Sequence, residues 1–437
     1  MRDFVSGNQS VRGGQGVDRL SVTDRGNVTD EKKLIYDWNS VDCASRAAEK
    51  PVLLNDETLR DGLQSPTVQD PSIKDKIRLL HLMDELGIDM ADIGLPGAGP
   101  RAYADVLALA REISSAKLNV APNCAARTTI RDIEPILSVC EKTGTVIEAA
   151  TFLGSSLIRQ YVEHWEIDTL LRRTEASVTF AVQHDLPVMY VTEDTTRTFP
   201  ETIKKLYTVA IECGARHIVL TDTVGHATPD GVRALVRFVV REIIEPSGEQ
   251  IRLAWHGHDD RGLSVPNSLT ALEAGADVVH ACALGIGERV GNTPMDQLLV
   301  NLKLLGWLDR DLSALKEYCE TASEACKVPI PSGYPVVGRD AFRTATGVHA
   351  AAVIKALRTG DVVLADLVYS GVPAEAFGME QSVEIGHMSG RSNVIYWLEK
   401  RGIKATEDRV NEIYTRAKGS DRLLTEEEIL QIAQPPA

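Results

Sequence analysis

The strongest constraint on the fold is an alternation of short apolar runs with amphipathic stretches, which repeats eight times between residue 51 and about residue 305. The intervening stretches carry apolar residues at helical spacing, as Ile73, Ile77 and Leu80 do. Strand–helix alternation predicts a parallel sheet, and eight units is the number that closes a TIM (β/α)8 barrel. The predicted strands are Val52–Leu54, Met90–Leu95, Leu118–Ala121, Val146–Phe152, Pro187–Thr192, His217–Thr221, Arg252–His256 and Val278–Ala283.

An open doubly wound α/β sheet is the alternative, because it also alternates strands with helices. Two features favour the barrel: no glycine-rich phosphate loop follows the first strand, and polar residues collect after many strands rather than at one crevice. We therefore predict a catalytic TIM barrel that is followed by a smaller, mainly helical C-terminal region. The expected divisions are a mobile N-terminal arm (1–47), the barrel (48–308), a helical segment and linker (309–334) and a C-terminal helical subdomain (335–437).

The composition limits which binding partners and which cellular compartment we expect for this protein. Lys and Arg number 47 against 62 Asp and Glu, so the net charge is −15, and such a chain repels phosphate backbones and anionic headgroups. We expect no nucleic acid and no membrane as a partner. The seven cysteines include no CxxC pair, no apolar run approaches the ~18 residues of a membrane span, and the N-terminus lacks the apolar core of a secretory signal. These features predict a cytoplasmic protein with reduced thiols.

His256 and His258 are the sharpest local signal for chemistry. Residues two apart on an extended chain point to the same side, and in a TIM barrel the active site forms where the strands end. Two imidazoles and a carboxylate suit a divalent metal that binds a chelating substrate. Asp61 is the expected carboxylate, because it follows strand one, which adjoins strand eight in a closed barrel. Such a shell fits Mg, Mn, Zn or Co, and the alternative is a hydrogen-bonded histidine pair.

Motifs at these strand ends resemble the metal-dependent DRE-TIM superfamily, which holds 2-isopropylmalate, homocitrate and citramalate synthases and hydroxymethylglutaryl-CoA lyase. They are LRDGLQSP, TDTVGHATP, HGHDDRGLSVPNSLTALEAGA and GIGERVGNTPMDQLLVNL. The resemblance covers residues 50–308, and it continues into FRTATGVHAAAVIKAL and GHMSGRSNVIYWLEKRGI, which resemble the C-terminal subdomain of the condensing enzymes. It implies an acyltransferase that condenses acetyl-CoA with a 2-oxo acid, releases CoA, and works as a homodimer.

The resemblance also implies roles for individual residues. Arg60 would stabilise the oxygen of the 2-oxo acid as negative charge develops, and Thr223 would hold its carboxylate. His349 would act at the acetyl group and would come from the partner subunit. The full expectation is catalytic roles for Arg60, Glu193, His349 and Tyr369, substrate contacts for Gln64, Thr223, Arg127 and Arg159, and metal ligation by Asp61, His256, His258 and Asn292.

Plainer structural roles compete with several of these assignments. Arg60 is also suited to a salt bridge at the barrel rim, and Thr223 to a turn at a strand end. Asp194 is better suited to capping the next helix than to catalysis. Without the TGVHAAA motif around it, His349 would be interpreted as an ordinary core or surface histidine, and Tyr369 as a packing residue.

The acceptor is not determined by the sequence, which leaves 2-oxoisovalerate, 2-oxoglutarate, oxaloacetate, pyruvate and a phosphonate analogue open. Leu63 stands where many relatives have Glu, and TFLGSSLIR is closer to the Ser-Ser-x-x-Arg of homocitrate synthases than to the Thr-Ser-x-x-His of many isopropylmalate synthases. Arg127 and Arg159 are therefore predicted to face an acidic acceptor. The alternative is that both arginines pair with carboxylates of the barrel.

The alternatives to a condensing enzyme are a lyase of the same superfamily and a non-catalytic metabolite-binding barrel. Lyases of the superfamily usually stop soon after the barrel and use a cysteine in a mobile loop near strand eight. Here Cys282 falls within the predicted strand and residues 309–437 follow the barrel. A non-catalytic metabolite-binding barrel would be expected to have lost its ligands, whereas the acid, both histidines and the asparagine are all present.

Overall fold

The computed structural model describes residues 34–41 and 50–434. The chain divides into two units, Met1–Ser45 and Arg46–Ala437. In the first unit, a short 3-10 helix, η2 (Trp38–Ser40), begins after Asp37, whose side chain accepts a hydrogen bond from the backbone N–H of Asn39. The predicted mobile arm otherwise lies outside the described residues. Within the described part of the chain, no helix combines the length and the apolar character that crossing a membrane requires.

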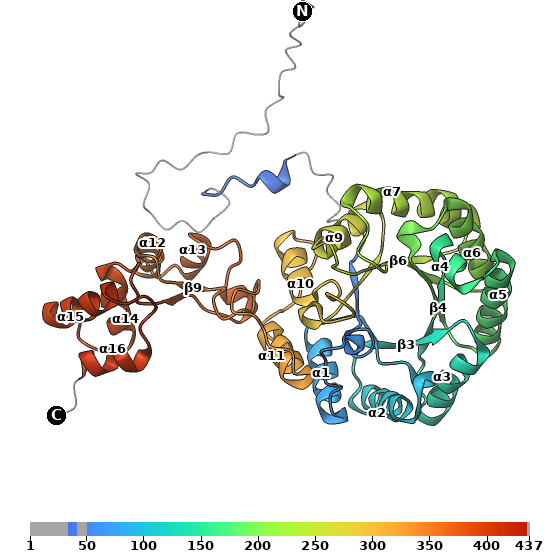
Figure 1. Cartoon of the computed structure of the whole chain (residues 1–437), viewed down its shortest axis with the longest axis horizontal. Coiled ribbons are helices and arrows are strands. Elements are labelled where there is room, and N and C mark those ends of the chain that lie inside the picture. The colour runs from blue at the N-terminus through green and yellow to red at the C-terminus, as the bar shows by residue number, and fades with distance from the viewer. Residues whose placement is uncertain (1–33, 42–49, 435–437) are drawn as a thin grey trace, which may run out of the picture. The chain divides into compact units, whose positions relative to one another are not determined.

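Eight parallel strands close into a barrel in the order β1 to β8 (Figure 1). β1 pairs with both β2 and β8, and Leu53 aligns with Val278 across the closing pair. The strands are β1 (Leu53–Asp56), β2 (Met90–Asp92), β3 (Ala121–Arg127), β4 (Glu148–Gly154), β5 (Val188–Glu193), β6 (His217–Asp222), β7 (Arg252–Gly257) and β8 (Val278–Ala281). The predicted TIM barrel is therefore confirmed.

Helices surround the barrel and bury their apolar faces against it (Figure 1). The sequence sets their ends locally: α1 begins after Ser72, whose hydroxyl accepts from the N–H of Asp75, and α3 ends at Gly144 with φ 70°. The barrel helices are α1 (Ile73–Glu85), α2 (Pro100–Ala116), α3 (Ile130–Thr143), α4 (Leu157–Glu163), α5 (Ile167–Gln183), α6 (Pro200–Glu212), α7 (Pro229–Val239), α8 (Glu245–Ser247), α9 (Ser264–Ala274) and α10 (Met295–Leu304).

The third strand differs from its prediction. The apolar run pointed to Leu118–Ala121, whereas β3 spans Ala121–Arg127 and pairs with β4 from Asn123 to Arg127. Its interior residues are small or polar, as Asn123 and Cys124 are, so no apolar run marks it, although both are buried. Asn123 can be buried inside the barrel because its amide donates a hydrogen bond to Asn55 Oδ1 at 2.7 Å.

The region after the barrel is mainly helical, as expected. It begins with α11 (Leu315–Cys326), which packs against α1. A separate small core gathers around Val394, Trp397 and Ile413. The remaining elements are β9 (Arg343–Thr344), α12 (Gly347–Leu357), α13 (Val362–Leu367), β10 (Ser382–Val383), α14 (Arg391–Lys400), α15 (Glu407–Lys418) and α16 (Glu426–Ala433).

Candidate active site

Asp61, His256 and His258 converge on one point at the carboxyl ends of the barrel strands. His256 is the penultimate residue of β7, His258 follows that strand, and Asp61 follows β1. The Nε2 atoms of the two imidazoles are 3.4 Å apart, and Asp61 Oδ2 lies 3.4 Å from His256 Nε2 and 3.6 Å from His258 Nε2. All three side chains are buried. The group has the donor set and spacing of a divalent-metal site.

Unpartnered polar atoms around this group fit a bound cation. Asp61 Oδ2 and Asn292 Oδ1 are buried without a hydrogen-bond partner, and Asn292 forms an isolated antiparallel bridge with His258. An unsatisfied buried polar atom costs about 1–3 kcal/mol, which ligation would offset. Burial alone would raise the pKa of Asp61, but Arg60 and the two histidines outweigh it and hold that pKa well below its usual range. Burial and His256 lower the pKa of His258 to about 4, which leaves its imidazole neutral at pH 7.

Arg60 is held between three carboxylates beside this group. Its Nε donates to Asp92 Oδ2 at 2.8 Å, its Nη1 lies 3.3 Å from Asp61 Oδ1, and its Nη2 pairs with Glu57. The side chain keeps 21% exposure and lines the cavity above the barrel. The salt-bridge role and the role at the site are therefore compatible, because the ion pairs fix a guanidinium that still faces the cavity.

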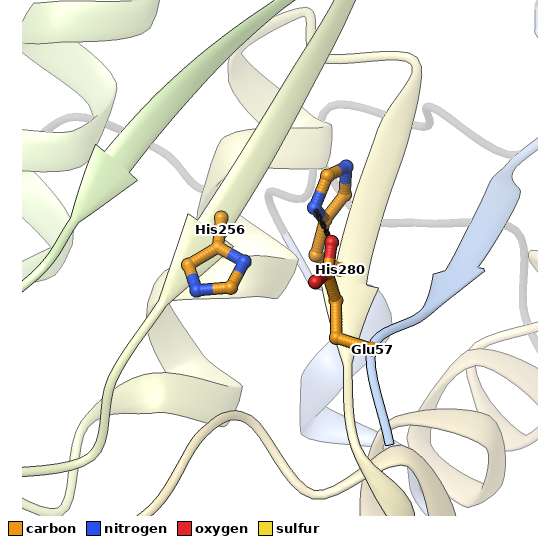
Figure 2. A group of neighbouring side chains, drawn as sticks. All are labelled: Glu57, His256 and His280. Atoms are coloured by element: carbon orange, nitrogen blue, oxygen red, sulfur yellow. Dashed lines mark ion pairs between the residues drawn. The ribbon is translucent and has the colours of Figure 1, made fainter. Parts of the chain in front are cut away.

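Glu57, His256 and His280 form a second group (Figure 2). It shares His256 with the first group. Glu57 Oε1 is 2.8 Å from His280 Nδ1, and the candidate ligand atoms of the three residues all lie within 4.8 Å of one another. Burial alone would raise the pKa of Glu57, but Arg60 and His280 lower it to about 2. Sequence reasoning left Glu57 and His280 unassigned. A signal existed, because alternation along β8 turns Val278 and His280 to the same side.

A cavity of about 230 Å³ lies above these groups. Gln64, Glu193 and Thr223, three of the residues singled out from the sequence, line it together with Arg60 and the metal-site histidines. Burial raises the pKa of Glu193. Thr223 Oγ1 accepts a hydrogen bond of 2.8 Å from the N–H of Asp194, so its own hydroxyl proton can still be donated to a ligand.

The neighbouring Asp194 does not cap the following short helix with its side chain. Its carboxylate instead accepts from Arg197 Nε and Nη2 at 2.8 and 2.7 Å. The capping role suggested by the sequence is therefore wrong. The residue adopts φ 61°, and its bidentate arginine pair orders the turn after β5.

The two arginines expected to face an acidic acceptor lie outside the cavity lining. Arg127 pairs with Asp132 through Nε at 2.6 Å and Nη2 at 3.0 Å. Arg159 pairs with Glu163 at 2.9 Å, and its Nε lies 4.0 Å from Glu193. Both arginines therefore have carboxylate partners in their own chain.

His349 and Tyr369 meet in the C-terminal region. Their rings stack with centroids 4.2 Å apart and an interplanar angle of 26°. Both residues are exposed, and neither lines the barrel cavity of its own chain. The two rings are therefore in direct contact, whereas the sequence indicated only that both residues belong to the C-terminal region.

Comparisons with known proteins agree with this geometry. A family model described as HMGL-like matches residues 52–323. Homocitrate synthase AksA of Methanopyrus kandleri is 33% identical over 84% of this chain and 87% of its own length, and a probable 2-isopropylmalate synthase of that organism is 31% identical over 84% and 69%.

Solved structures with a similar fold include two HMG-CoA lyases. The lyase from Bacillus subtilis has a TM-score of 0.56 at 21% identity and covers 65% of this chain and 97% of its own. The lyase from Acinetobacter baumannii, in complex with coenzyme A and 3-methylmalate, has a TM-score of 0.53 at 20% identity and covers 65% of this chain and 93% of its own. At such identities the likeness concerns the fold.

Proposed function

The chain belongs to the HMGL-like family, and on that premise we propose that it is a metal-dependent acyltransferase that condenses acetyl-CoA with a 2-oxo acid. The observation that carries the proposal is the convergence of Asp61, His256 and His258 beside Arg60 in one cavity. Relatives that share about a third of their residues with most of this chain are named as synthases.

The reaction has two parts whose atoms balance. A base removes a proton from the thioester methyl of acetyl-CoA, and that carbon forms a new bond to C2 of the 2-oxo acid while the ketone oxygen gains a proton and becomes a hydroxyl. Water then cleaves the thioester. The products are a 2-hydroxy di- or tricarboxylic acid and CoA with a free thiol.

Asp61, His256, His258 and Asn292 would hold the divalent cation. When bound, the cation supplies Lewis-acid polarisation of the ketone. Arg60 would stabilise the negative charge that develops on the ketone oxygen, and its carboxylate partners position it before substrate arrives.

Two further side chains have roles at the acceptor. Thr223 would donate its hydroxyl proton to the acceptor carboxylate, since its oxygen already accepts from the backbone. Glu193 would hold a proton for the forming hydroxyl, because burial raises its pKa and it lines the same cavity. Gln64 lines the cavity as well and would contact the substrate.

The base at the acetyl methyl is proposed to be His349 of a second copy of the chain, accompanied by Tyr369. Both face outward, and apolar neighbours such as Val348 and Met388 are 73% and 60% exposed. Tyr161 on α4, which follows β4 near the cavity, is 79% exposed. Uncovered apolar side chains of this kind favour association, so a homodimer would complete each site.

The lyase alternative is less well supported. A lyase cysteine must be reachable and readily deprotonated. Cys282 is fully buried just after β8, its Sγ lies 3.3 Å from Asn292 Nδ2, and burial raises the pKa of its thiol well above the usual range. This residue is therefore unsuited to the role that a lyase would require of it.

The test is thiol release from acetyl-CoA by the full-length chain, assayed with each of several 2-oxo acids in the presence of Mg, Mn, Zn or Co. We expect acceptor-dependent thiol release that stops when a chelator is added. Absence of thiol release with every acceptor and metal would refute the condensing function. Cleavage of 3-hydroxy-3-methylglutaryl-CoA without added acceptor would support the lyase instead.

A further inference from the structure

We propose that the acceptor is a 2-oxo acid whose side chain is apolar and uncharged, an inference that rests on the proposed condensing function. The acceptor class is the property that the sequence left open. We infer the acceptor class from the distribution of polar and apolar residues in the lining of the cavity, and from the carboxylates with which the nearby arginines pair.

The metal-site residues and most of the apolar lining of the cavity come from opposite sides of the barrel. The metal-site residues, Arg60, Glu57 and His280 belong to β1, β7, β8 and the turns after them. In a closed barrel of this order, β3 to β5 lie across from those strands. The lining residues from β2 to β6 are apolar at seven positions and polar at three. The apolar ones are Leu95, Ala125, Ala150, Phe152, Met189, Val191 and Val219, and the polar ones are Glu193, Thr221 and Thr223.

Strand alternation explains how this apolar wall is built. Phe152 follows Ala150 by two residues on β4, and Val191 follows Met189 by two on β5, so each pair points into the barrel. Ala150 and Met189 are buried in a small cluster inside the barrel. Leu95, Phe152 and Val191 are half-buried and present apolar surface to whatever occupies the cavity.

The charges of the cavity oppose a second carboxylate on the acceptor. Glu57, Asp61, Glu193 and Glu288 all line it, whereas Arg60 is the sole Lys or Arg among the described lining residues. That guanidinium already contacts three carboxylates. A second acceptor carboxylate would be desolvated with no further Lys or Arg of the lining to pair with it, and it would face Glu193 and Glu288, which is costly.

The two arginines that might have served such an acceptor are already paired with carboxylates. Arg127 is bound in bidentate fashion by Asp132, and Arg159 is bound by Glu163 and lies 4.0 Å from Glu193 of the lining. Once the carboxylate and ketone of the acceptor occupy the polar side, its remaining carbons have the apolar wall as their surroundings. A short aliphatic side chain gains free energy there by leaving water, and a charged side chain does not.

The experiment measures kcat/KM for acceptors by thiol release, with the full-length protein, acetyl-CoA and the metal that gives the highest rate. We expect 2-oxoisovalerate or another short aliphatic 2-oxo acid to exceed 2-oxoglutarate and oxaloacetate by about 100-fold or more. Equal or higher kcat/KM with 2-oxoglutarate or oxaloacetate would overturn the inference and leave the condensing function intact. Absence of release with every acceptor would overturn the condensing function and the inference with it.

A matched pair of variants tests the apolar wall itself. Phe152→Ala should lower kcat/KM for 2-oxoisovalerate by about 10-fold or more and should raise the relative rate with a longer aliphatic acceptor, because space opens beside the substrate. Phe180→Ala is the control: Phe180 lies half-buried on α5, outside the cavity lining, and should leave the acceptor ratio unchanged. Val191→Ala repeats the test with a smaller truncation. An unchanged acceptor ratio in folded Phe152→Ala and Val191→Ala would contradict the inference.

Discussion

Replacing Glu57 by Gln tests whether the buried carboxylates beside the metal group hold Arg60 in its working position. Glu57 is almost fully buried, and it pairs with Arg60, lies 2.8 Å from His280 Nδ1 and accepts from Asn55 Nδ2 at 2.8 Å. Glutamine keeps the size and the hydrogen-bonding oxygen but removes the negative charge. The variant therefore isolates the electrostatic part of these contacts.

The loss of stability expected for Glu57→Gln follows from the contacts in which a charged oxygen becomes neutral. A hydrogen bond to a charged group contributes about 1 kcal/mol more than a neutral one, and the two contacts that weaken are those to Arg60 and His280. The expected loss is about 2 kcal/mol in the free energy of unfolding. If the same loss frees Arg60 from its working orientation, kcat should fall by about 30-fold, with a smaller change in KM for the acceptor.

The assay pairs steady-state thiol release with denaturant unfolding. Glu112→Gln is the matched control, because Glu112 also pairs with a histidine, His81, at 2.7 Å, but on the protein surface. It should change neither kcat nor stability by a measurable amount. A folded Glu57→Gln protein with the wild-type kcat would refute the idea that Glu57 positions Arg60.

The remaining predictions concern the subunit boundary and pH. If His349 serves the neighbouring barrel, mixing inactive His349→Ala with inactive Arg60→Ala should restore activity in about a quarter of the sites; tagged heterodimers without turnover would contradict this. Burial raises the pKa of Asp296 to about 7 from an ordinary 3.8, so its contribution to stability is fully present below pH 3.8 and is lost as pH rises through 7. As pH rises from 4 to 8, Asp296→Asn should therefore gain about 4 kcal/mol in the free energy of unfolding relative to wild type, measured by denaturant unfolding. The exposed control Asp311→Asn should show no such gain. A pH profile of Asp296→Asn that runs parallel to that of wild type would contradict the prediction.

The sequence predicts best what depends on local periodicity. The eightfold alternation gave the barrel, and the two-residue spacing of His256 and His258 placed both imidazoles on one side. The third strand escaped prediction because its interior residues, such as Asn123, are small or polar, and their burial depends on partners from other strands. The residue pattern of one strand does not reveal hydrogen bonds to side chains on other strands.

The parts of the site that sequence reasoning missed are those made by long-range contact. Glu57 and His280 meet because β1 and β8 close the barrel, although 223 residues separate them in the chain. For Arg127 and Arg159 the sequence left two environments open, an acidic acceptor or carboxylates of the barrel. Both arginines pair with carboxylates close in sequence, Asp132 and Glu163, which follow at five and four residues.

Condensation should depend on a metal that Asp61, His256 and His258 bind. The most direct measurement is metal content by elemental analysis together with thiol release for wild type, His258→Gln and His280→Gln. We expect His258→Gln to lose both the bound metal and thiol release, whereas His280→Gln should keep stoichiometric metal because the contact of His280 is with Glu57. Stoichiometric metal in His258→Gln, or undiminished thiol release from metal-free wild type, would contradict this expectation.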